Sequence, residues 1–178
     1  MKKVRLNIKV SKPFGNLFRK QSVLIVIETS QNEFLVGAKP QQYPPTITRL
    51  IGGGVENNES AEDAAIREIC EELGTELEKL RISQLLTIIV SAEDETGKTY
   101  KHMVNVFYAN IGKADFKPGD DVQALIKMPL SGLYDLGERY EALPETLWYN
   151  GPEGFYSWSD YAKLYGPVHK LSYEALKK

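Results

Sequence analysis

Three glutamates of the chain are spaced so that their carboxylates can act together. Glu68, Glu71 and Glu72 stand at positions i, i+3 and i+4, which project from the same face of a helix. Because like charges at this spacing destabilise an isolated helix by about 0.3 kcal/mol per pair, we expect a cation to compensate them. Oxygen ligands alone favour a hard divalent ion, Mg²⁺ or Mn²⁺, over zinc. The alternative is a solvated acidic face, which is the ordinary role of charged helix positions.

A glycine run precedes the segment that carries these glutamates. The run is Gly52-Gly53-Gly54, where the absence of a Cβ lets the backbone turn tightly and approach a ligand. A helix is predicted over 60–73, because Ser60 is a favoured N-cap residue, Asp63 is its capping-box partner and Gly74 suits a left-handed C-terminal cap. One face of this helix is expected to pack against a sheet, and its apolar residues are Ala65, Ile66, Ile69 and Leu73.

The wider pattern from Gly53 to Thr75 resembles the Nudix box, written GX5EX7REUXEEXGU with U a bulky aliphatic residue. Every fixed polar or glycine position is matched, as is the aliphatic position at Ile69; the matching residues are Gly53, Glu59, Arg67, Glu68, Glu71, Glu72 and Gly74. Two departures are visible. Thr75 stands where the family has an aliphatic residue, and Ile51 stands where it often has a proline. We expect the first departure to cost some packing and no chemistry.

The resemblance implies a metal-binding role for the glycine loop and the helix. It implies that Glu71 and Glu72 are the principal ligands of Mg²⁺ or Mn²⁺, and that Gly52 supplies a backbone carbonyl. Glu68 is implied to be either a further ligand or the base that activates water. A cation held there neutralises charge on a diphosphate and lowers the pKa of a bound water.

The resemblance also implies roles for residues around the metal ligands. Arg67 is similar to the family arginine that orients the glutamates by ion pairing, with Glu59 as its partner, and the same pair can serve as a helix-stabilising salt bridge. Asp121 stands where many relatives carry a glutamate that acts as a later base, and an exposed acid in a turn is an equal alternative. Substrate phosphates are expected at Arg49, Gly53 and Gly54.

The function implied by the resemblance is hydrolysis of a diphosphate linkage in a nucleoside diphosphate derivative, such as a nucleotide sugar, a dinucleotide or a modified nucleoside triphosphate. One alternative is a nucleotide-sensing module of the same fold that does not cleave, although such members commonly lose box glutamates and this chain keeps them all. A weaker alternative is an enzyme like isopentenyl-diphosphate isomerase. That enzyme calls for a catalytic cysteine and metal-binding histidines, which are not evident here.

The apolar patterns predict the elements that position the box. Strands are expected over 4–10, 23–27, 34–36, 85–90, 103–109 and 122–128, with a charged hairpin tip over 93–98. The continuous β-branched run at 23–27 suits a strand buried on both faces. The resemblance implies the fold class α/β (α+β), a Nudix-like α/β/α sandwich with a mixed sheet, and the order of the expected strands around the box looks like that of the family. Residues 1–130 are expected to form the Nudix domain and 131–178 an aromatic-rich, partly helical extension packed on it.

The extension is expected to contain short helices that begin at Ser157, with Asp160 completing a capping box, and at Ser172. Its aromatic residues, with two earlier tyrosines, suit either a satellite core or dimer contact, which we favour, or stacking on a base; they are Tyr43, Tyr100, Tyr134, Tyr140, Trp148, Tyr149, Phe155, Tyr156 and Trp158. His102 and His169 are too isolated in the sequence to assign.

The composition excludes several other functions. Lys and Arg total 22 against 24 Asp and Glu in 178 residues, so no positive field exists to hold a nucleic-acid duplex. The single cysteine excludes an internal disulfide and a cysteine-rich zinc site. No apolar stretch predicts a signal peptide or a membrane span, and a cytoplasmic protein is expected. The expected partner is a small nucleotide diphosphate substrate, and a homodimer is compatible with the sequence.

Overall fold

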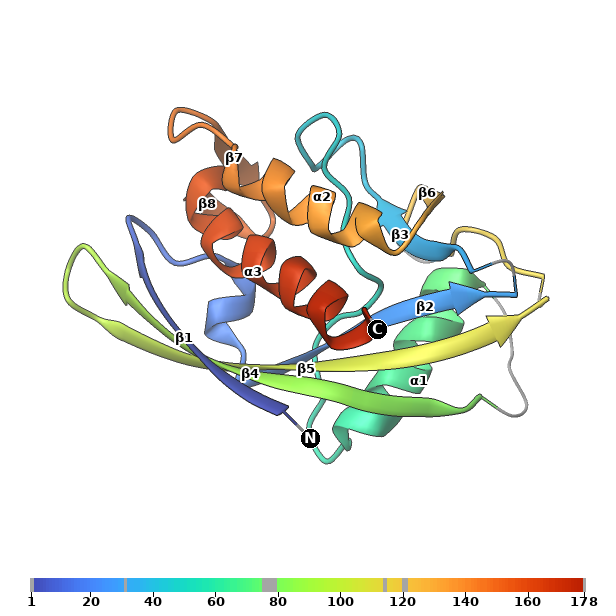
Figure 1. Cartoon of the computed structure of the whole chain (residues 1–178). Coiled ribbons are helices and arrows are strands. Elements are labelled where there is room, and N and C mark those ends of the chain that lie inside the picture. The colour runs from blue at the N-terminus through green and yellow to red at the C-terminus, as the bar shows by residue number, and fades with distance from the viewer. Residues whose placement is uncertain (1, 31, 75–79, 114, 120–121, 178) are drawn as a thin grey trace.

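A computed structural model describes residues 2–30, 32–74, 80–113, 115–119 and 122–177. Its centre is a mixed sheet of six strands in the order β1-β4-β5-β2-β3-β6, with α1 on one face and α2 and α3 on the other (Figure 1). The pairs β1–β4 and β2–β5 are parallel, and the remaining neighbours are antiparallel. The strands are β1 (Lys2–Val10), β2 (Gln21–Thr29), β3 (Phe34–Ala38), β4 (Ile82–Asp94), β5 (Thr99–Gly112) and β6 (Ala124–Met128). The predicted α+β fold with a mixed sheet is confirmed.

The central strand β2 explains why its sequence is apolar without alternation. Leu24 and Val26 face the core beneath α2 and α3, whereas Val23, Ile25 and Ile27 face the core beneath α1. Because successive side chains of a strand point to opposite faces, a strand covered on both sides must be apolar throughout. The prediction of a strand buried on both faces is therefore confirmed.

The helix α1 (Ala61–Leu73) begins and ends where the sequence predicted. The Ser60 hydroxyl accepts a hydrogen bond from the Asp63 N–H at 3.0 Å and donates one to the Asp63 carboxylate at 2.7 Å. Gly74 ends the helix in the left-handed conformation, with φ of 55°. The helix buries Ala65, Ile69 and Leu73 against the sheet, so its position is fixed by packing as well as by its caps.

The predicted hairpin and final strand are also present. Strands β4 and β5 pair as a long antiparallel hairpin, whose tip is closed by Asp94 Oδ1 accepting from the backbone N–H groups of Thr96 and Lys98 at 2.9 and 3.1 Å. The last strand of the sheet, β6, pairs with β3. The short 3₁₀ helix η1 (Gly15–Phe18), which was not predicted, leads into β2.

The C-terminal segment differs from the prediction of short helices. It contains α2 (Ser131–Glu141), a small hairpin of β7 (Trp148–Gly151) and β8 (Gly154–Ser157), and the single long helix α3 (Trp158–Leu176). Ser157 is the N-cap of α3 as predicted, but the helix continues through Pro167. The prediction of a second helix start at Ser172 is wrong, because its hydroxyl donates to the Val168 carbonyl at 2.8 Å, one turn earlier in the same helix. Asp160 does not complete the capping box; its carboxylate accepts from the Ser11 N–H at 2.8 Å.

Two glycines let α2 and α3 approach each other closely. A Cβ added to Gly137 of α2 would lie 2.9 Å from the Gly166 carbonyl oxygen, and one added to Gly166 of α3 would lie 3.3 Å from that of Gly137. Gly166 therefore serves the packing of α3 against α2. In the described part of the chain, no helix is long and apolar enough to cross a membrane.

Most of the C-terminal aromatic residues pack into the core on this face of the sheet. Tyr140, Tyr156 and Trp158 are buried, and the rings of Tyr161 and Tyr165 stack with centroids 4.2 Å apart. These rings join side chains of β1, β2, β4 and β5 in one continuous cluster. The buried rings therefore belong to the main core on this face of the sheet, a more central role than the satellite core expected above, while Tyr134, Trp148 and Phe155 remain exposed.

Candidate active site

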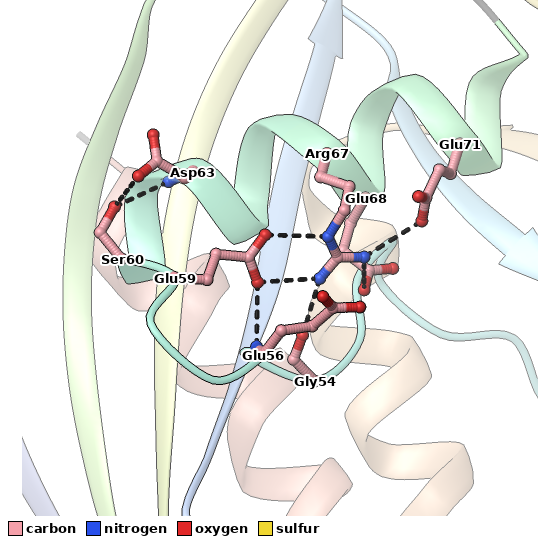
Figure 2. Close-up of polar contacts among 8 residues, drawn as sticks. All are labelled: Gly54, Glu56, Glu59, Ser60, Asp63, Arg67, Glu68 and Glu71. Atoms are coloured by element: carbon pink, nitrogen blue, oxygen red, sulfur yellow. Dashed lines mark hydrogen bonds and ion pairs between the residues drawn. The ribbon is translucent and has the colours of Figure 1, made fainter.

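Arg67 is the centre of a network of hydrogen bonds on the acidic face of α1 (Figure 2). Its Nε and Nη2 atoms donate to the two carboxylate oxygens of Glu59 at 2.9 and 3.1 Å. Nη1 donates to Glu68 at 2.9 Å and to Glu71 at 3.1 Å, and Nη2 also donates to the Gly54 carbonyl at 2.9 Å. One guanidinium thereby holds the glycine loop and three carboxylates in fixed positions. The planar, multiply bonded guanidinium suits this role better than an ammonium would.

The loop between the glycines and the helix is held by Glu59. Its Oε2 atom accepts from the Glu56 N–H at 2.9 Å in addition to its bonds with Arg67. These bonds hold the pKa of the Glu59 carboxyl below its ordinary value. The residues predicted to form an ion pair, Arg67 and Glu59, are therefore together in the structure, and the pair also closes the loop.

Glu72 lies away from this network, on the buried side of the helix. Only 4% of its surface is exposed, and its Oε2 atom accepts from the Gly52 N–H at 3.2 Å. Burial raises the pKa of the Glu72 carboxyl to about 7, although the charges of Arg49 and Lys39 and the Gly52 N–H act in the opposite direction. A divalent cation near this carboxylate would further favour its ionised form.

The conformations of Gly52 and Gly53 explain why glycine stands at both positions. Gly52 has φ of 140°, which other residues avoid, and a side chain there would collide with the Val23 carbonyl of β2. A Cβ at Gly53 would collide with the carboxylate of Glu68. The loop backbone is thus in direct contact with β2 on one side and with the acidic helix on the other.

Arg49 was predicted to meet a substrate phosphate, and its present partners belong to the protein. Its Nη2 atom donates to the Gly52 carbonyl at 2.9 Å, and Nη1 lies 3.4 Å from the Tyr161 hydroxyl oxygen. Burial opposes the charge of the guanidinium, but the carboxylate of Glu72 acts to raise its pKa, and Arg49 is charged at neutral pH. Arg49 therefore links the glycine loop to the aromatic core and provides positive charge beside Glu72.

The three box glutamates do not converge on one point. Glu68 and Glu71 meet at Arg67, whereas Glu72 faces Gly52, and the described residues contain no group of three carboxylate, imidazole or thiol side chains placed to hold a metal ion. Asp121, the predicted later base, lies outside the described residues.

The chemistry of the donor set nevertheless fits a divalent cation. In the described part of the chain, Glu68, Glu71 and Glu72 each keep one carboxylate oxygen that no hydrogen bond engages. The Gly52 carbonyl accepts one bond from Arg49, and a carbonyl oxygen has a second lone pair. Burial raises the pKa of Glu68 as it does that of Glu72, so two buried acids would gain from a nearby positive charge. All four donors are oxygens, the ligand type that Mg²⁺ and Mn²⁺ prefer.

A cavity of about 520 Å³ opens beside this network. It is lined by Arg19, Gly54, Val55, Glu56, Asn57, Arg67 and Glu68. The cavity therefore brings box residues together with Arg19, which the sequence analysis did not single out. No motif marked Arg19, because it precedes β2 and is distant from the box in sequence.

The sequence analysis also left His169 unassigned, and the structure places it beside the glycine loop. His169 of α3 is fully buried, and its Nε2 atom accepts from the Leu50 N–H at 3.4 Å. Its Nδ1 atom donates to the Tyr165 carbonyl at 2.6 Å, which fixes the neutral tautomer. Burial lowers the pKa of this histidine to about 4. His169 is thus a structural link between α3 and the segment before Gly52, which isolated bridges at Arg49 and Ile51 join to the sheet.

Comparison with known proteins identifies the fold family of this arrangement. The model of the NUDIX domain matches residues 18–144. Among solved structures, the chain is similar to an Ap4A hydrolase of C. elegans in a binary complex, with 24% identity, a TM-score of 0.52 and coverage of 67% of this chain and 86% of that one. No curated protein matches the chain.

Two further solved structures have similar folds. The dihydroneopterin triphosphate pyrophosphohydrolase of E. coli is 19% identical, with a TM-score of 0.54 and coverage of 66% of this chain and 86% of that one. The NUDIX domain of Shewanella oneidensis NrtR, complexed with ADP ribose, is 18% identical, with a TM-score of 0.50 and coverage of 66% and 77%. At these identities the likeness concerns the fold.

Proposed function

This chain belongs to the NUDIX family, and we propose that it is a Mg²⁺- or Mn²⁺-dependent enzyme that cleaves the diphosphate linkage of a nucleoside diphosphate derivative. Family membership makes it a Nudix pyrophosphohydrolase, which acts on phosphorus anhydrides. Beyond family membership, we propose the dependence on a divalent metal and the presence of a nucleoside in the substrate. The observation that carries the proposal is the network in which Arg67 holds Glu59, Glu68, Glu71 and the Gly54 carbonyl around one end of α1.

The residues that would hold the cation are Glu68, Glu71, Glu72 and the Gly52 carbonyl. When bound, a divalent cation there neutralises charge on the diphosphate and lowers the pKa of a coordinated water. Arg67 contributes by fixing the carboxylates of Glu68 and Glu71, because ligands held in place lose little freedom when a substrate arrives. Glu68 is either a further ligand or the base that takes a proton from the attacking water.

The reaction that we propose breaks one phosphorus anhydride bond of the substrate. Hydrolysis forms one new bond between a water oxygen and phosphorus, breaks the P–O bond of the anhydride bridge, and releases a proton. On the side where a Cβ would stand, Gly53 faces the Glu68 carboxylate and Gly54 faces the Arg19 guanidinium, so a phosphate that reaches this loop would meet both side chains. Arg49, which is held against the Gly52 carbonyl, adds positive charge on the buried side of the same loop.

The substrate class is supported by what the similar structures are named for. They include an Ap4A hydrolase, a dihydroneopterin triphosphate pyrophosphohydrolase and a domain complexed with ADP ribose. Each of these ligands joins phosphates to a larger organic group that contains an aromatic ring system. We therefore propose a nucleoside diphosphate linked to another group, for which a nucleotide sugar, a dinucleotide and a modified nucleoside triphosphate are the test compounds.

A panel of these compounds tests the proposal. Phosphate-containing products should appear with Mg²⁺ or Mn²⁺, disappear with a chelator and return when the cation is restored. Glu72→Gln should abolish turnover, whereas Glu62→Gln on the exposed first turn of α1 is a matched control that should leave it unchanged. Binding of nucleotides without turnover by the wild-type protein would instead support the sensing module, and turnover that is unaffected by the chelator would contradict the metal.

A further inference from the structure

Arg19 carries a guanidinium that no other group of the described chain engages through a side-chain hydrogen bond or an ion pair. It is exposed, lines the cavity of about 520 Å³ beside the box, and lies over the glycine loop. The contact with the loop is close, because a Cβ added to Gly54 would collide with the Arg19 guanidinium. The positive charge of the Arg19 side chain therefore lies against the loop backbone, where a substrate phosphate would approach.

The other arginine of this cavity is already engaged. Arg67 donates to Glu59, Glu68, Glu71 and the Gly54 carbonyl, so its donors are committed to the protein. Among the described residues that line the cavity, Arg19 is therefore the cation available to a phosphate group. Glu56 and Glu68 line the same cavity, so an anion there also needs the divalent cation of the proposed function.

The backbone of Arg19 is fixed from the sheet by a buried histidine. His102 of β5 is 2% exposed, and its Nδ1 atom donates to the Arg19 carbonyl at 2.9 Å. Its Nε2 atom lies 3.0 Å from the hydroxyl of Ser22, at the start of β2. These bonds fix the position of the backbone at Arg19 next to the glycine loop, although Arg19 lies in the connection between η1 and β2.

A second cavity, of about 410 Å³, begins at Arg19 and leads away from the box. It is lined by Gly15, Asn16, Phe18, Arg19, Pro152, Glu153 and Gly154. The Phe18 ring is 64% exposed, and it is supported by a perpendicular contact with Tyr100 at 5.8 Å between centroids. An exposed ring next to an uncommitted arginine offers a stacking surface adjacent to a phosphate site.

We propose that Arg19 binds the diphosphate of the substrate and that Phe18 stacks on the aromatic base of the attached nucleoside. This inference rests on the proposed function, since it names the substrate contacts of the same site. Glu153 lines the second cavity, and its carboxylate would repel a further phosphate group there. The second cavity therefore favours an uncharged base. Arg19 thus stands at the boundary between a phosphate subsite and a base subsite.

Two probes separate the two contacts. ADP carries a base and two phosphates, whereas inorganic pyrophosphate carries phosphates alone, and each is titrated calorimetrically in the presence of Mg²⁺. Arg19→Gln is expected to weaken binding of both probes by about tenfold or more, because the charge-assisted bonds are lost. Phe18→Leu, which keeps apolar bulk but removes the ring, is expected to weaken ADP binding about tenfold and leave pyrophosphate binding unchanged.

Matched variants exclude general effects of charge and folding. Arg5→Gln removes an exposed arginine from β1, away from the residues of either cavity, and should bind both probes as the wild type does. Arg19→Lys should bind both probes more tightly than Arg19→Gln does, and Phe18→Tyr should bind ADP more tightly than Phe18→Leu does. Thermal melting should be the same for all these variants, because both side chains are exposed.

The outcomes also distinguish this inference from the proposed function. Unchanged binding in Arg19→Gln would overturn the phosphate contact, and equal loss of both probes in Phe18→Leu would overturn the base contact. Hydrolysis by the wild type with the same KM in Arg19→Gln would leave the proposed function intact and defeat this inference. Arg19-dependent binding of ADP by a wild-type protein that hydrolyses nothing would support the subsite and defeat the hydrolase.

Discussion

The carboxylate of Glu72 accepts a hydrogen bond from the backbone N–H of Gly52 at 3.2 Å, and this bond joins α1 to the glycine loop. The acid is almost fully buried there, next to Arg49 and Lys39, and the pKa of its carboxyl rises to about 7. The proposed metal ligand is therefore also a group that costs stability whenever it ionises without a cation.

The first prediction concerns Glu72→Gln in protein freed of divalent cations. The folded pKa lies near 7, above the ordinary value of 4.5, so the native state keeps a proton that the unfolded chain loses. Wild-type stability should fall as pH rises from about 4.5 to 7, and Glu72→Gln should remove this loss. At pH 8 we expect the variant to be more stable by about 1–3 kcal/mol while its turnover is abolished.

Urea unfolding with a chelator, from pH 4.5 to 8, measures this effect. Glu62→Gln, on the exposed first turn of the same helix, should follow the wild-type curve. If Glu72→Gln were less stable than the wild type at pH 8, ionisation of the buried Glu72 would not be what lowers the stability of the wild type.

The second prediction concerns Arg67→Lys. An ammonium keeps the charge but cannot bond Glu59, Glu68 and Glu71 at once, so the carboxylates should lose their fixed positions. We expect kcat/KM to fall on the order of 10- to 100-fold, as is usual when a group that orients metal ligands is lost. The dependence of rate on Mg²⁺ concentration should shift to higher concentrations in the same titration. An unchanged Mg²⁺ requirement would show that Arg67 stabilises the helix without orienting the ligands.

Much of this site was predictable because local sequence decides it. The caps at Ser60 and Gly74 and the two-sided burial of β2 follow from short-range patterns, and the pairing of Arg67 with Glu59 was implied by the resemblance to the Nudix box. The separation of Glu72 from the other glutamates was not predictable, because it depends on where the loop from Gly52 packs against α1. The spacing of residues along a helix determines which of them lie on the same face, but not which residues of other elements that face contacts.

The long helix α3 was missed for a related reason. Gly166 and Pro167 are ordinarily helix-breaking, and the sequence alone offers no sign that the glycine serves the approach of Gly137. Tertiary packing overrides local propensity at this point. The division of the chain at residue 130 stays a prediction, and the aromatic residues of the C-terminal segment share one core with the first strands.

The third prediction concerns the contact between α2 and α3. Gly137→Val should place a side chain against the Gly166 backbone and lower the free energy of unfolding by about 1–3 kcal/mol. Asp135→Val is the control, because it places the same side chain at an exposed position of the same helix, where valine and aspartate have similar helix propensities. Denaturant unfolding at neutral pH compares the two variants. Equal stability of the two would refute the close approach of the helices.

The fourth prediction concerns His169. Its folded pKa of about 4 lies below the ordinary value of 6.5, so the native state binds fewer protons than the unfolded chain at mildly acidic pH. The stability that it provides is complete above pH 6.5 and is lost as pH falls toward 4, by about 1–3 kcal/mol in all. Protonation would place an N–H opposite the Leu50 N–H, which has no other acceptor among the residues that the structure describes.

Because Glu72 changes stability in the opposite direction over nearly the same pH range, the effect of His169 is measured in the Glu72→Gln background. In that background, the free energy of unfolding should fall as pH is lowered from 6.5 to 4.5. Adding His169→Gln should reduce this dependence on pH and lower the free energy of unfolding overall. An equally steep curve in the double variant would assign the acid sensitivity to another group.

The bond between His169 and Leu50 gives the last helix a direct hold on the segment that precedes the glycines. The same helix buries its apolar side chains in the core that it shares with β1, β2, β4 and β5. Loosening of α3 and loosening of the sheet are therefore coupled, and activity should be lost on heating together with the folded core.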